Sequence, residues 1–214
     1  MTALESQQGP AQVAQRIAAQ TDKLCNLLSQ RSILVPSDLA ATSTTELWTT
    51  HDGEIEELRA TITALTRRLN LLLEGPQGFL HEYVSVNWEH GALYALLQYN
   101  VLEKLPLDGS SRAVQDLASE TNMPYDKLLR ICRLISTVGI LKEPMEEFFS
   151  HTAISAELAT NQGFRSFIEF QLFETRVASA HLADSLQEAH HFWKGRSAFE
   201  HAYAYHNGSQ THAG

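Results

Sequence analysis

The hydrophobic pattern of the chain predicts mostly helices. Apolar side chains recur at helical spacing over residues 11–30, 54–74 and 83–100. Gly75 and Pro76 should end the second of these helices, and a Pro-, Ser- and Thr-rich linker over residues 31–53 precedes it. The second helix carries a stripe with alternating spacings of three and four, made of Ile55, Leu58, Ile62, Leu65, Leu69 and Leu72. We take the stripe as a candidate dimer interface, with packing on the first helix or on its own domain as the alternatives.

A helix-turn-helix followed by a hairpin is predicted in the middle of the chain. Ser110 or Ser111 is the expected N-cap of a short helix through Val114, and the turn TNMP leads to a longer helix that ends at a Gly139 cap. The runs GILKE, PMEE and FFSHT then predict a β-hairpin. The expected fold class is therefore mainly α, a winged helix-turn-helix with a small β-hairpin wing and additional long dimerisation helices.

The C-terminal part is predicted to be helical from residue 153 to about 187, with an aromatic and then polar tail after it. The expected organisation is an N-terminal helix and flexible linker over 1–53, a main domain over 54–192, and a docked aromatic segment with a frayed tail over 193–214.

Composition and charge narrow the classes of partner. The chain has 16 Lys and Arg against 25 Asp and Glu, a net charge of -9, which disfavours nucleic acid and anionic membranes. Lys127, Arg130 and Arg133 follow one another by threes on the second helix of the helix-turn-helix, and we interpret them as a solvated helix face rather than a DNA-reading one. With two cysteines and neither a leader nor an apolar run long enough to span a membrane, we expect a cytoplasmic protein.

The segment from about residue 71 to 205 resembles the N-terminal domain of fungal polyketide and plant-type O-methyltransferases. The resemblance rests on GPQGFL, LEKLPLDGSSRAVQDLASETNMPYDKLLRICRLISTVGILKEP, FSHTAISAEL and AFEHAY. It implies a helical domain that forms an intertwined homodimer and covers the substrate pocket of a following Rossmann-like domain. In the family that second domain binds S-adenosylmethionine and carries the catalytic base.

The resemblance also defines what we do not expect in this chain. No three of its glycines form a G-x-G-x-x-G or G-x-G-x-G loop, so we expect a truncated protein with no methyl-donor site and no catalytic residue. S-adenosylmethionine would enter only if a complete partner subunit supplied its site. We expect no metal site either, because His201 and His206 are five residues apart and do not share a helix face, and the remaining histidines, such as His181, His190 and His191, form no ligand pattern.

Aromatic and polar side chains on the helices that line the substrate side in the family are candidate pocket residues, with ordinary core packing as the alternative. They are Trp88, His90, Tyr94, Phe167, Phe170, Phe173 and Glu174. His151, in FSHTAIS, is interpreted as structural, beside Ser and Thr residues that can cap the next helix.

Three functions remain open after the sequence. The first is a dimerisation and substrate-capping module of polyketide metabolism, paired with a second copy or with a full-length methyltransferase, with a small aromatic or polyketide ligand. The second is a binding protein resembling the transcriptional coactivators of fungal metabolite clusters, which would act through a partner. The third is a methyltransferase-derived cyclase, which requires an enclosed aromatic pocket with a polar group such as His90 or Glu174 pointing into it.

Overall fold

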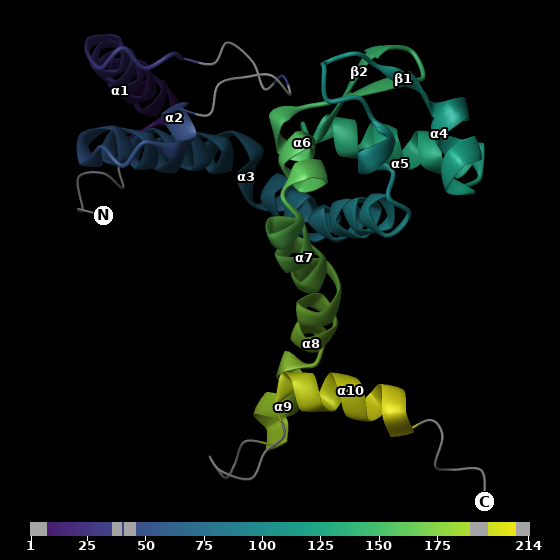
Figure 1. The fold of residues 1–214 in the computed structure, drawn as a ribbon. Coiled ribbons are helices and arrows are strands. Elements are labelled where there is room, and N and C mark those ends of the chain that lie inside the picture. The colour runs from purple at the N-terminus through teal and green to yellow at the C-terminus, as the bar shows by residue number, and fades with distance from the viewer. Residues whose placement is uncertain (1–7, 36–39, 41–45, 189–196, 209–214) are drawn as a thin grey trace, which may run out of the picture. The chain divides into compact units, whose positions relative to one another are not determined.

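The computed structural model describes residues 8–35, 40, 46–188 and 197–208 (Figure 1). The chain divides into two compact units, Met1–Trp88 and Glu89–Gly214, and each is described by itself. The architecture is mainly helical with one small antiparallel sheet, which confirms the predicted fold class. The predicted domain boundaries, after Gly53 and after residue 192, stay a prediction.

The first unit is built on an antiparallel pair of helices, α1 (Pro10–Gln30) and the first part of α3 (Gly53–Gln98). Ion-pairing and hydrogen-bonding groups connect the pair at both ends. Arg31, just after α1, lies 3.2 Å from the carboxylate of Asp52, just before α3. Arg68 of α3 donates to the backbone carbonyl of Gln8, just before α1, at 3.4 Å. A short helix, α2 (Glu46–Thr49), lies in the segment predicted to be an irregular linker.

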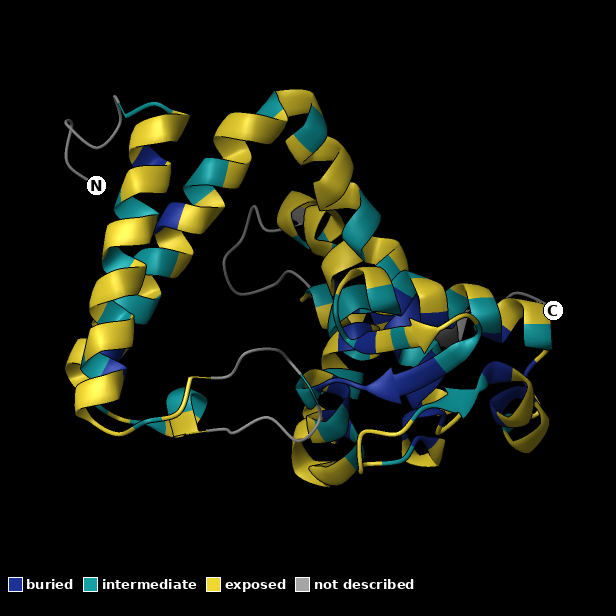
Figure 2. Cartoon of the chain, turned by 90° about the horizontal axis from the view of Figure 1, so that it is seen from above, coloured by how far each residue is buried: buried dark blue, intermediate teal, exposed yellow. Residues whose placement is uncertain are grey.

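The helix α3 bends sharply at Gly75, which is visible in Figure 2. Gly75 has φ 67° and ψ 179°, a backbone conformation that residues with a Cβ rarely adopt, and Pro76 has no N–H to continue the helical ladder. The predicted break at Gly75-Pro76 is therefore confirmed. Helix resumes directly after the break rather than near Tyr83, because Pro76 is well suited to the first turn of a helix and the single Gly78 does not prevent it.

The second unit contains the sheet and the two short helices around it. After the 3-10 turn η2 (Leu102–Lys104), its elements are β1 (Arg112–Ala113), α4 (Val114–Thr121), α5 (Tyr125–Thr137), β2 (Leu141–Met145) and β3 (Phe148–His151). The strand order is β1-β3-β2, with all neighbours antiparallel. The order helix, turn, helix, hairpin was predicted from the sequence.

The two caps predicted in this region have different outcomes. The N-cap at Ser110 or Ser111 is wrong: Ala113 precedes the first turn of α4, because Arg112 and Ala113 pair with β3. The cap at Gly139 is confirmed. Gly139 has φ 77°, and the following N–H, of Ile140, donates 3.2 Å to the carbonyl of Ile135 in the last turn of α5.

The hydrophobic core lies in the second unit. Leu96 and Leu97 at the end of α3 pack with Leu117 of α4, Leu128 of α5 and Phe149 of β3, all of them fully buried. Figure 2 shows the buried residues concentrated in these elements, whereas α1 and the first part of α3 are mostly exposed. The core helices therefore form a stable base for the chain that follows the sheet.

That following chain is a series of short helices, as predicted for residues 153–187. They are α6 (Ala153–Thr160), α7 (Gln162–Phe170), the π-helical turn η3 (Gln171–Thr175), α8 (Arg176–Ala180) and α9 (Leu182–Glu188). A last helix, α10 (Ala198–Gly208), packs against α8 and α9. The frayed tail predicted at the C-terminus falls on residues 209–214, outside the described residues. None of the helices in the described part of the chain is long and apolar enough to cross a membrane.

Candidate functional site

A buried arginine ties α7 to the core. Only 8% of Arg165 is exposed, and its guanidinium donates to the backbone carbonyl of Leu97 at 2.6 Å and to the side-chain oxygen of Asn100 at 2.9 Å. It also forms ion pairs with Glu103 and, at 3.1 Å, with Glu169. The carbonyls at the end of α3 carry its negative dipole end, so a cation there is stabilising. Arg165 thereby fixes the start of the helices that carry the candidate aromatic residues.

Aromatic rings stack in pairs along these helices. Phe173, in the π-helical turn, stacks on Tyr94 of α3 with a centroid distance of 5.4 Å and an angle of 8° between the rings. Phe170 stacks on Phe199 of α10 at 6.3 Å, and Phe199 on Tyr203 at 6.4 Å. A π-helical turn inserts one residue into a helix, and such turns occur frequently at functional sites.

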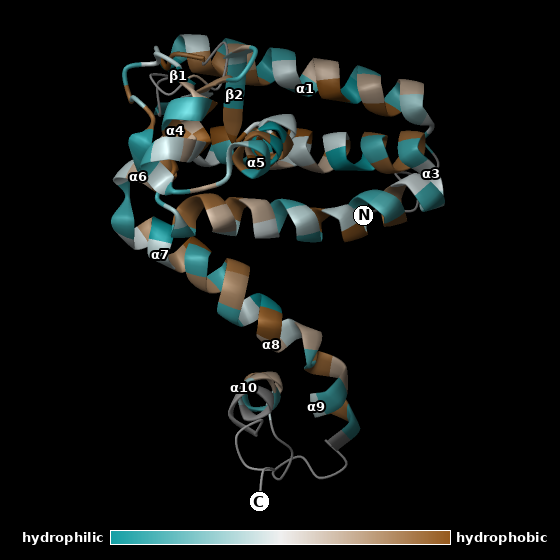
Figure 3. Ribbon diagram, turned by 90° about the vertical axis from the view of Figure 1, so that its right-hand side faces the viewer, coloured by the Kyte–Doolittle hydropathy of each residue, from teal (hydrophilic) through white to brown (hydrophobic). Residues whose placement is uncertain are grey.

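Much of the apolar surface of these helices is in contact with solvent. We call the surface the aromatic arm and define it by the exposed apolar residues of α7 to α10, which are Phe164, Phe167, Phe170, Phe173, Leu182, Leu186, Phe199 and Tyr203. Their exposed fractions run from 39% to 66%. Figure 3 shows hydrophobic residues along α7 and α8. Many large apolar side chains exposed on neighbouring helices are typical of a surface that another molecule covers.

The predicted pocket residues lie in different surroundings. Tyr94 and Phe173 are in direct ring contact. Glu174, the residue after Phe173, is half-buried. Phe167 and Phe170 are 53% and 46% exposed. Trp88, 74% exposed, belongs to the first unit, whereas His90 lies just inside the second and is exposed. A ligand-facing role for the seven residues stays a prediction.

Three aromatic residues of the arm, Phe164, Phe199 and Tyr203, were missing from the predicted set. Phe199 and Tyr203 extend the stack that begins at Phe170. The signal in the sequence was their spacing of four in AFEHAY, which places two rings on one side of a helix. It was used for the resemblance but not for the site.

The six candidate interface residues of α3 differ in burial. Ile55 and Leu65 are buried, at 0% and 7% exposure, on the helix that runs beside α1. Leu58, Ile62 and Leu69 are half-buried, and Leu72 is 43% exposed. The stripe thus serves at least partly to hold the first unit together, one of the alternatives left open by the sequence. Its role in a dimer stays a prediction.

The basic face of α5 is solvated and partly neutralised. Lys127, Arg130 and Arg133 are all exposed. Arg133 forms a two-pronged ion pair with Glu143 of β2, at 3.0 and 3.2 Å, and lies 3.9 Å from Glu146. The Arg133 guanidinium holds the pKa of Glu143 below its usual value, and Glu143 raises the pKa of Arg133. Carboxylates beside the helix would repel phosphate, so this face is poorly suited to DNA.

His151 has a structural position. It is 2% exposed, and its Nδ1 lies 2.9 Å from the hydroxyl of Ser155, which accepts from the backbone N–H of Thr152 at 3.1 Å. The hydroxyl of Thr152 instead donates back to the carbonyl of Ile140 at 2.7 Å. The predicted start of α6 is therefore present. The Ser155 hydroxyl accepts from the first backbone N–H of this start, and the Thr152 hydroxyl connects it to the backbone just after α5. Burial lowers the pKa of His151.

The other histidines form no cluster with Cys, Asp or Glu suited to a metal ion within the described residues. His181 pairs with Asp184 at 3.0 Å. His190, His191 and the side chain of His206 lie outside the described residues.

Comparison with solved structures shows which known fold this chain shares. The fold resembles the crystal structure of OxaC with a TM-score of 0.61 and 16% identity, over 89% of this chain and 48% of that one. It also resembles the mitomycin 7-O-methyltransferase MmcR, with a TM-score of 0.50 and 21% identity, over 63% of this chain and 40% of that one. The fold is that of the plant- and fungal-type O-methyltransferases.

Curated relatives agree with this class. The chain is 60% identical over 188 residues to the O-methyltransferase phnC of Penicillium herquei, covering 87% of this chain and 44% of the relative. It is 31% identical over 150 residues to the notoamide biosynthesis cluster transcriptional coactivator notR of Aspergillus sp., covering 70% of this chain and 32% of the relative. No family model matches. The chain is thus homologous to fungal O-methyltransferases and to coactivators related to them, and it spans less than half the length of these relatives.

Proposed function

We propose that these 214 residues form a dimerisation and substrate-capping module of an O-methyltransferase-like protein of fungal polyketide metabolism. The module holds no methyl donor itself, and methyl transfer depends on an S-adenosylmethionine-binding domain outside these residues, in a second polypeptide or in the remainder of a longer chain. The partner is a second copy or a full-length methyltransferase. The similarity to phnC supports the family relation on which this proposal is based.

The exposed aromatic arm is the observation that carries the proposal. Phe167 and Leu186 are 53% and 66% exposed although they lie on helices fixed to a well-packed core. Residues 71–88 of α3 add a second exposed apolar set, in which Leu73, Tyr83 and Trp88 reach 67%, 70% and 74%. Leaving large apolar side chains in water costs about 1.5–3 kcal/mol each compared with full burial, so covering these two surfaces favours association.

The proposed ligand is a small aromatic or polyketide molecule that is capped by the arm. Tyr94 and Phe173 show that ring stacking already occurs at this position. Flat aromatic molecules gain both area burial and ring stacking from such side chains. The candidate pocket residues of the second unit, from His90 to Glu174, are proposed to face this ligand once a donor domain completes the pocket.

Association and donor binding are tested on the same purified chain. Sedimentation equilibrium should show a dimer, and titration with S-adenosylmethionine should release no heat of binding. Leu72→Glu should weaken the dimer at least tenfold if the stripe Ile55–Leu72 is the interface, because an isologous interface would bury the new charge twice. Leu107→Glu is the matched control, since Leu72 and Leu107 have similar exposed fractions of 43% and 50% and Leu107 lies outside the stripe.

Two results would overturn the proposal. A chain that remains monomeric at all concentrations would remove the dimerisation role. Binding of S-adenosylmethionine by the chain alone would show that the donor site had been misplaced.

A coactivator-like role is the second candidate, favoured by the relatives. Besides notR, the transcriptional coactivator nsrH of Aspergillus novofumigatus is 35% identical over 109 residues, covering 50% of this chain and 24% of the relative. Such a role requires a protein partner rather than DNA, in keeping with the acidic surroundings of α5. Deleting the gene should then lower the transcripts of the metabolite cluster, whereas the capping module predicts normal transcripts and accumulation of an unmethylated product.

A cyclase is the third candidate, and it depends on enclosure. Phe167, Phe170 and Phe173 are all more than 40% exposed, so the chain alone does not enclose a ligand with them. A partner subunit would have to close the pocket. For the capping module and the cyclase the proposed location is the cytoplasm, in accordance with the free thiols of Cys25 and Cys132.

A further inference from the structure

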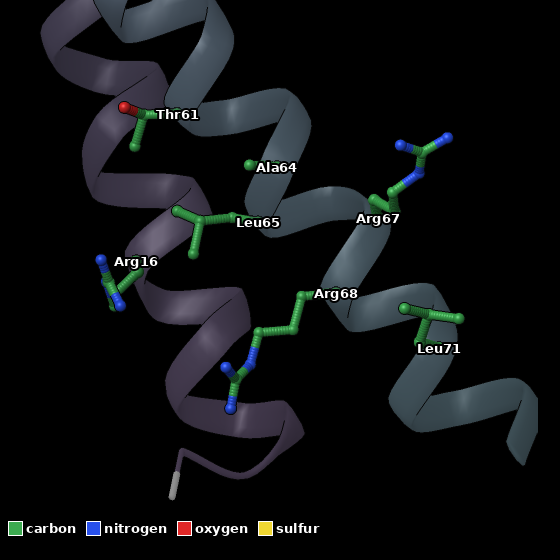
Figure 4. A pocket seen from close by; sticks show the side chains of 7 residues that line it. All are labelled: Arg16, Thr61, Ala64, Leu65, Arg67, Arg68 and Leu71. Carbon is green, nitrogen blue, oxygen red and sulfur yellow. The ribbon is translucent and has the colours of Figure 1, made fainter. Parts of the chain in front are cut away.

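The first part of α3 offers little free apolar surface to a second copy. Ile55 and Leu65 are already buried, and in Figure 4 Leu65 points toward α1. An open groove of about 470 Å³ remains beside Leu65, and its lining includes Arg16, Arg67 and Arg68. An isologous contact centred on this groove would bring the arginines of both copies together, and like charges side by side disfavour an interface.

Beyond the bend at Gly75, α3 carries a different face, still within the first unit. Leu80, Val84 and Trp88 follow one another by four residues, so they form a single row along the helix. Their exposed fractions are 58%, 63% and 74%. We call this row the α3 ridge. Three large apolar side chains are thus open to solvent on one side of one helix.

The α3 ridge lies in a part of the chain that is almost free of charge. Among residues 77–88, Glu82 is the only one with a formal charge at pH 7. Glu82 lies on another side of the helix, where it lines a hollow inside the bend together with Tyr83 and Val86. Charged residues are depleted in the cores of protein interfaces, and Trp and Tyr are enriched there. The ridge therefore has the composition of an interface core, although the whole chain has a net charge of -9.

The ridge is complementary to itself in an antiparallel arrangement. A two-fold axis at Val84 would place each Leu80 against Trp88 of the second copy, so a large ring meets a smaller side chain at both ends. In a parallel arrangement the two Trp88 rings would meet one another, and the ends of the two helix dipoles with the same sign would lie side by side. The antiparallel arrangement is therefore favoured.

The area of the ridge is sufficient for a small specific interface. Large aromatic side chains bury about 150–250 Å² each. With Tyr83 at its edge, 70% exposed, the ridge offers on the order of 500 Å² per copy, so two copies would bury on the order of 1,000 Å² in total. Specific interfaces begin at about this size.

We propose that a second copy of this chain docks on the α3 ridge, with the two ridges antiparallel and crossing at Val84. This inference rests on the proposed dimerisation role and names the surface that forms the dimer. Trp88 is then an anchor of the interface rather than a pocket residue. The stripe Ile55–Leu72, by contrast, mainly holds α1.

Disulfide trapping of the full chain tests the arrangement. In a Cys25→Ser background, which removes the exposed native thiol, Val84→Cys should give a covalent dimer on mild oxidation, because both copies contribute this position at the axis. Leu80→Cys and Trp88→Cys chains should cross-link to each other when mixed, and much less to themselves. Glu82→Cys is the matched control, exposed but off the ridge, and should remain monomeric on a nonreducing gel.

Sedimentation equilibrium tests the same contact without a cross-link. Val84→Glu should weaken self-association at least tenfold, because the two new carboxylates would be buried next to each other at the axis. The effect should exceed that of Leu72→Glu, which lies before the bend. Leu107→Glu, in the second unit, should leave self-association unchanged.

The possible failures separate this inference from the dimerisation role. A wild-type chain that is a dimer, combined with an unaffected Val84→Glu dimer or with no covalent dimer of Val84→Cys, would overturn the ridge as the interface and leave the dimerisation role in place. Self-linking of Leu80→Cys and of Trp88→Cys, without cross-linking between them, would overturn the antiparallel arrangement. A wild-type chain that stays monomeric would overturn both proposals.

Discussion

The two units of the chain bury their apolar side chains to very different extents. In the first unit, Val13, Leu28, Ile55 and Leu65 are the buried apolar side chains among the described residues. In the second unit, the end of α3, α4, α5, α6 and the sheet enclose one continuous core. An antiparallel pair of helices has only one shared face to bury, whereas a sheet with helices around it shares several.

The difference indicates which part of the chain needs a partner. The second unit has enough buried surface to hold its own fold, and the aromatic arm is its unsatisfied face. The first unit, with few buried side chains and a row of exposed ones near Gly75, depends more on what packs against it.

The sharpest way to break this comparison is to truncate one buried leucine in each unit. Leu128→Ala, at 0% exposure in the core, should lower the free energy of unfolding by about 2–5 kcal/mol. Leu65→Ala, beside an open groove, should cost less, about 2 kcal/mol at the lower end of the same range, because neighbouring side chains can close on the space. Urea unfolding followed by circular dichroism measures both. An equal or larger loss for Leu65→Ala would contradict the view that the first unit is loosely packed.

Arg165 tests how strongly the second unit holds its own C-terminal helices. Arg165→Met should lower the free energy of unfolding by about 2–3 kcal/mol, because it leaves the carboxylates of Glu103 and Glu169 without their cation and removes one of two donors from the Leu97 carbonyl. The same urea titration measures the loss. Arg130→Met on the exposed face of α5 should change stability by no more than about 0.5 kcal/mol. Similar values for the two variants would show that the buried arginine does not anchor α7.

His151 should make the free energy of unfolding of the second unit depend on pH, a dependence that we do not expect in the first unit. Because burial lowers its pKa in the folded state, the unfolded chain takes up a proton first as the pH falls below about 6.5. Stability should therefore be full above that pH and decline below it, by at most about 1.4 kcal/mol per pH unit, down to the lowered pKa of the folded state. Unfolding titrations between pH 7.5 and 5 measure the decline.

Two variants assign this pH dependence. His151→Asn should flatten the profile, since asparagine offers a polar atom to Ser155 and does not titrate in this range. His51→Asn is the control, because the side chain of His51 is 96% exposed. A profile that His151→Asn leaves unchanged would assign the acid sensitivity to another group.

The sequence predicted what local patterns determine. The periodicity of apolar residues located α1 to within one residue, and Gly75 and Gly139 marked a real break and a real cap because both need a positive φ. The strand β1 was missed, since two residues carry no alternation and Arg112 and Ala113 are strand only through their pairing with β3. The stripe Ile55–Leu72 predicted a helix-packing face but not which neighbour covers it.

The candidate site was predictable as a set of aromatic residues but not as an arrangement. Tyr94 and Phe173 were both predicted, yet their contact joins positions far apart in the chain. The same holds for Arg165, whose partners Leu97, Asn100 and Glu103 lie more than 60 positions before it. Nothing near Arg165 in the sequence indicates that it would be buried. Such pairings are set by the tertiary fold, and one sequence contains no local trace of them.

The π-helical turn at Gln171–Thr175 has a consequence for how this helix can change length. The turn accommodates one residue more than an α-helix would, so removing any one residue within it would restore regular helix without breaking the chain. Because the turn absorbs that residue locally, α8 would keep its rotation about the helix axis relative to α7, and Ala178 would stay buried. The residues of the turn itself would be spaced anew, so the ring contact of Phe173 with Tyr94 is what such a deletion would change. A single codon lost here would thus alter one ring pair and leave the rest of the arm in register, which makes the turn a natural place for relatives to differ in length.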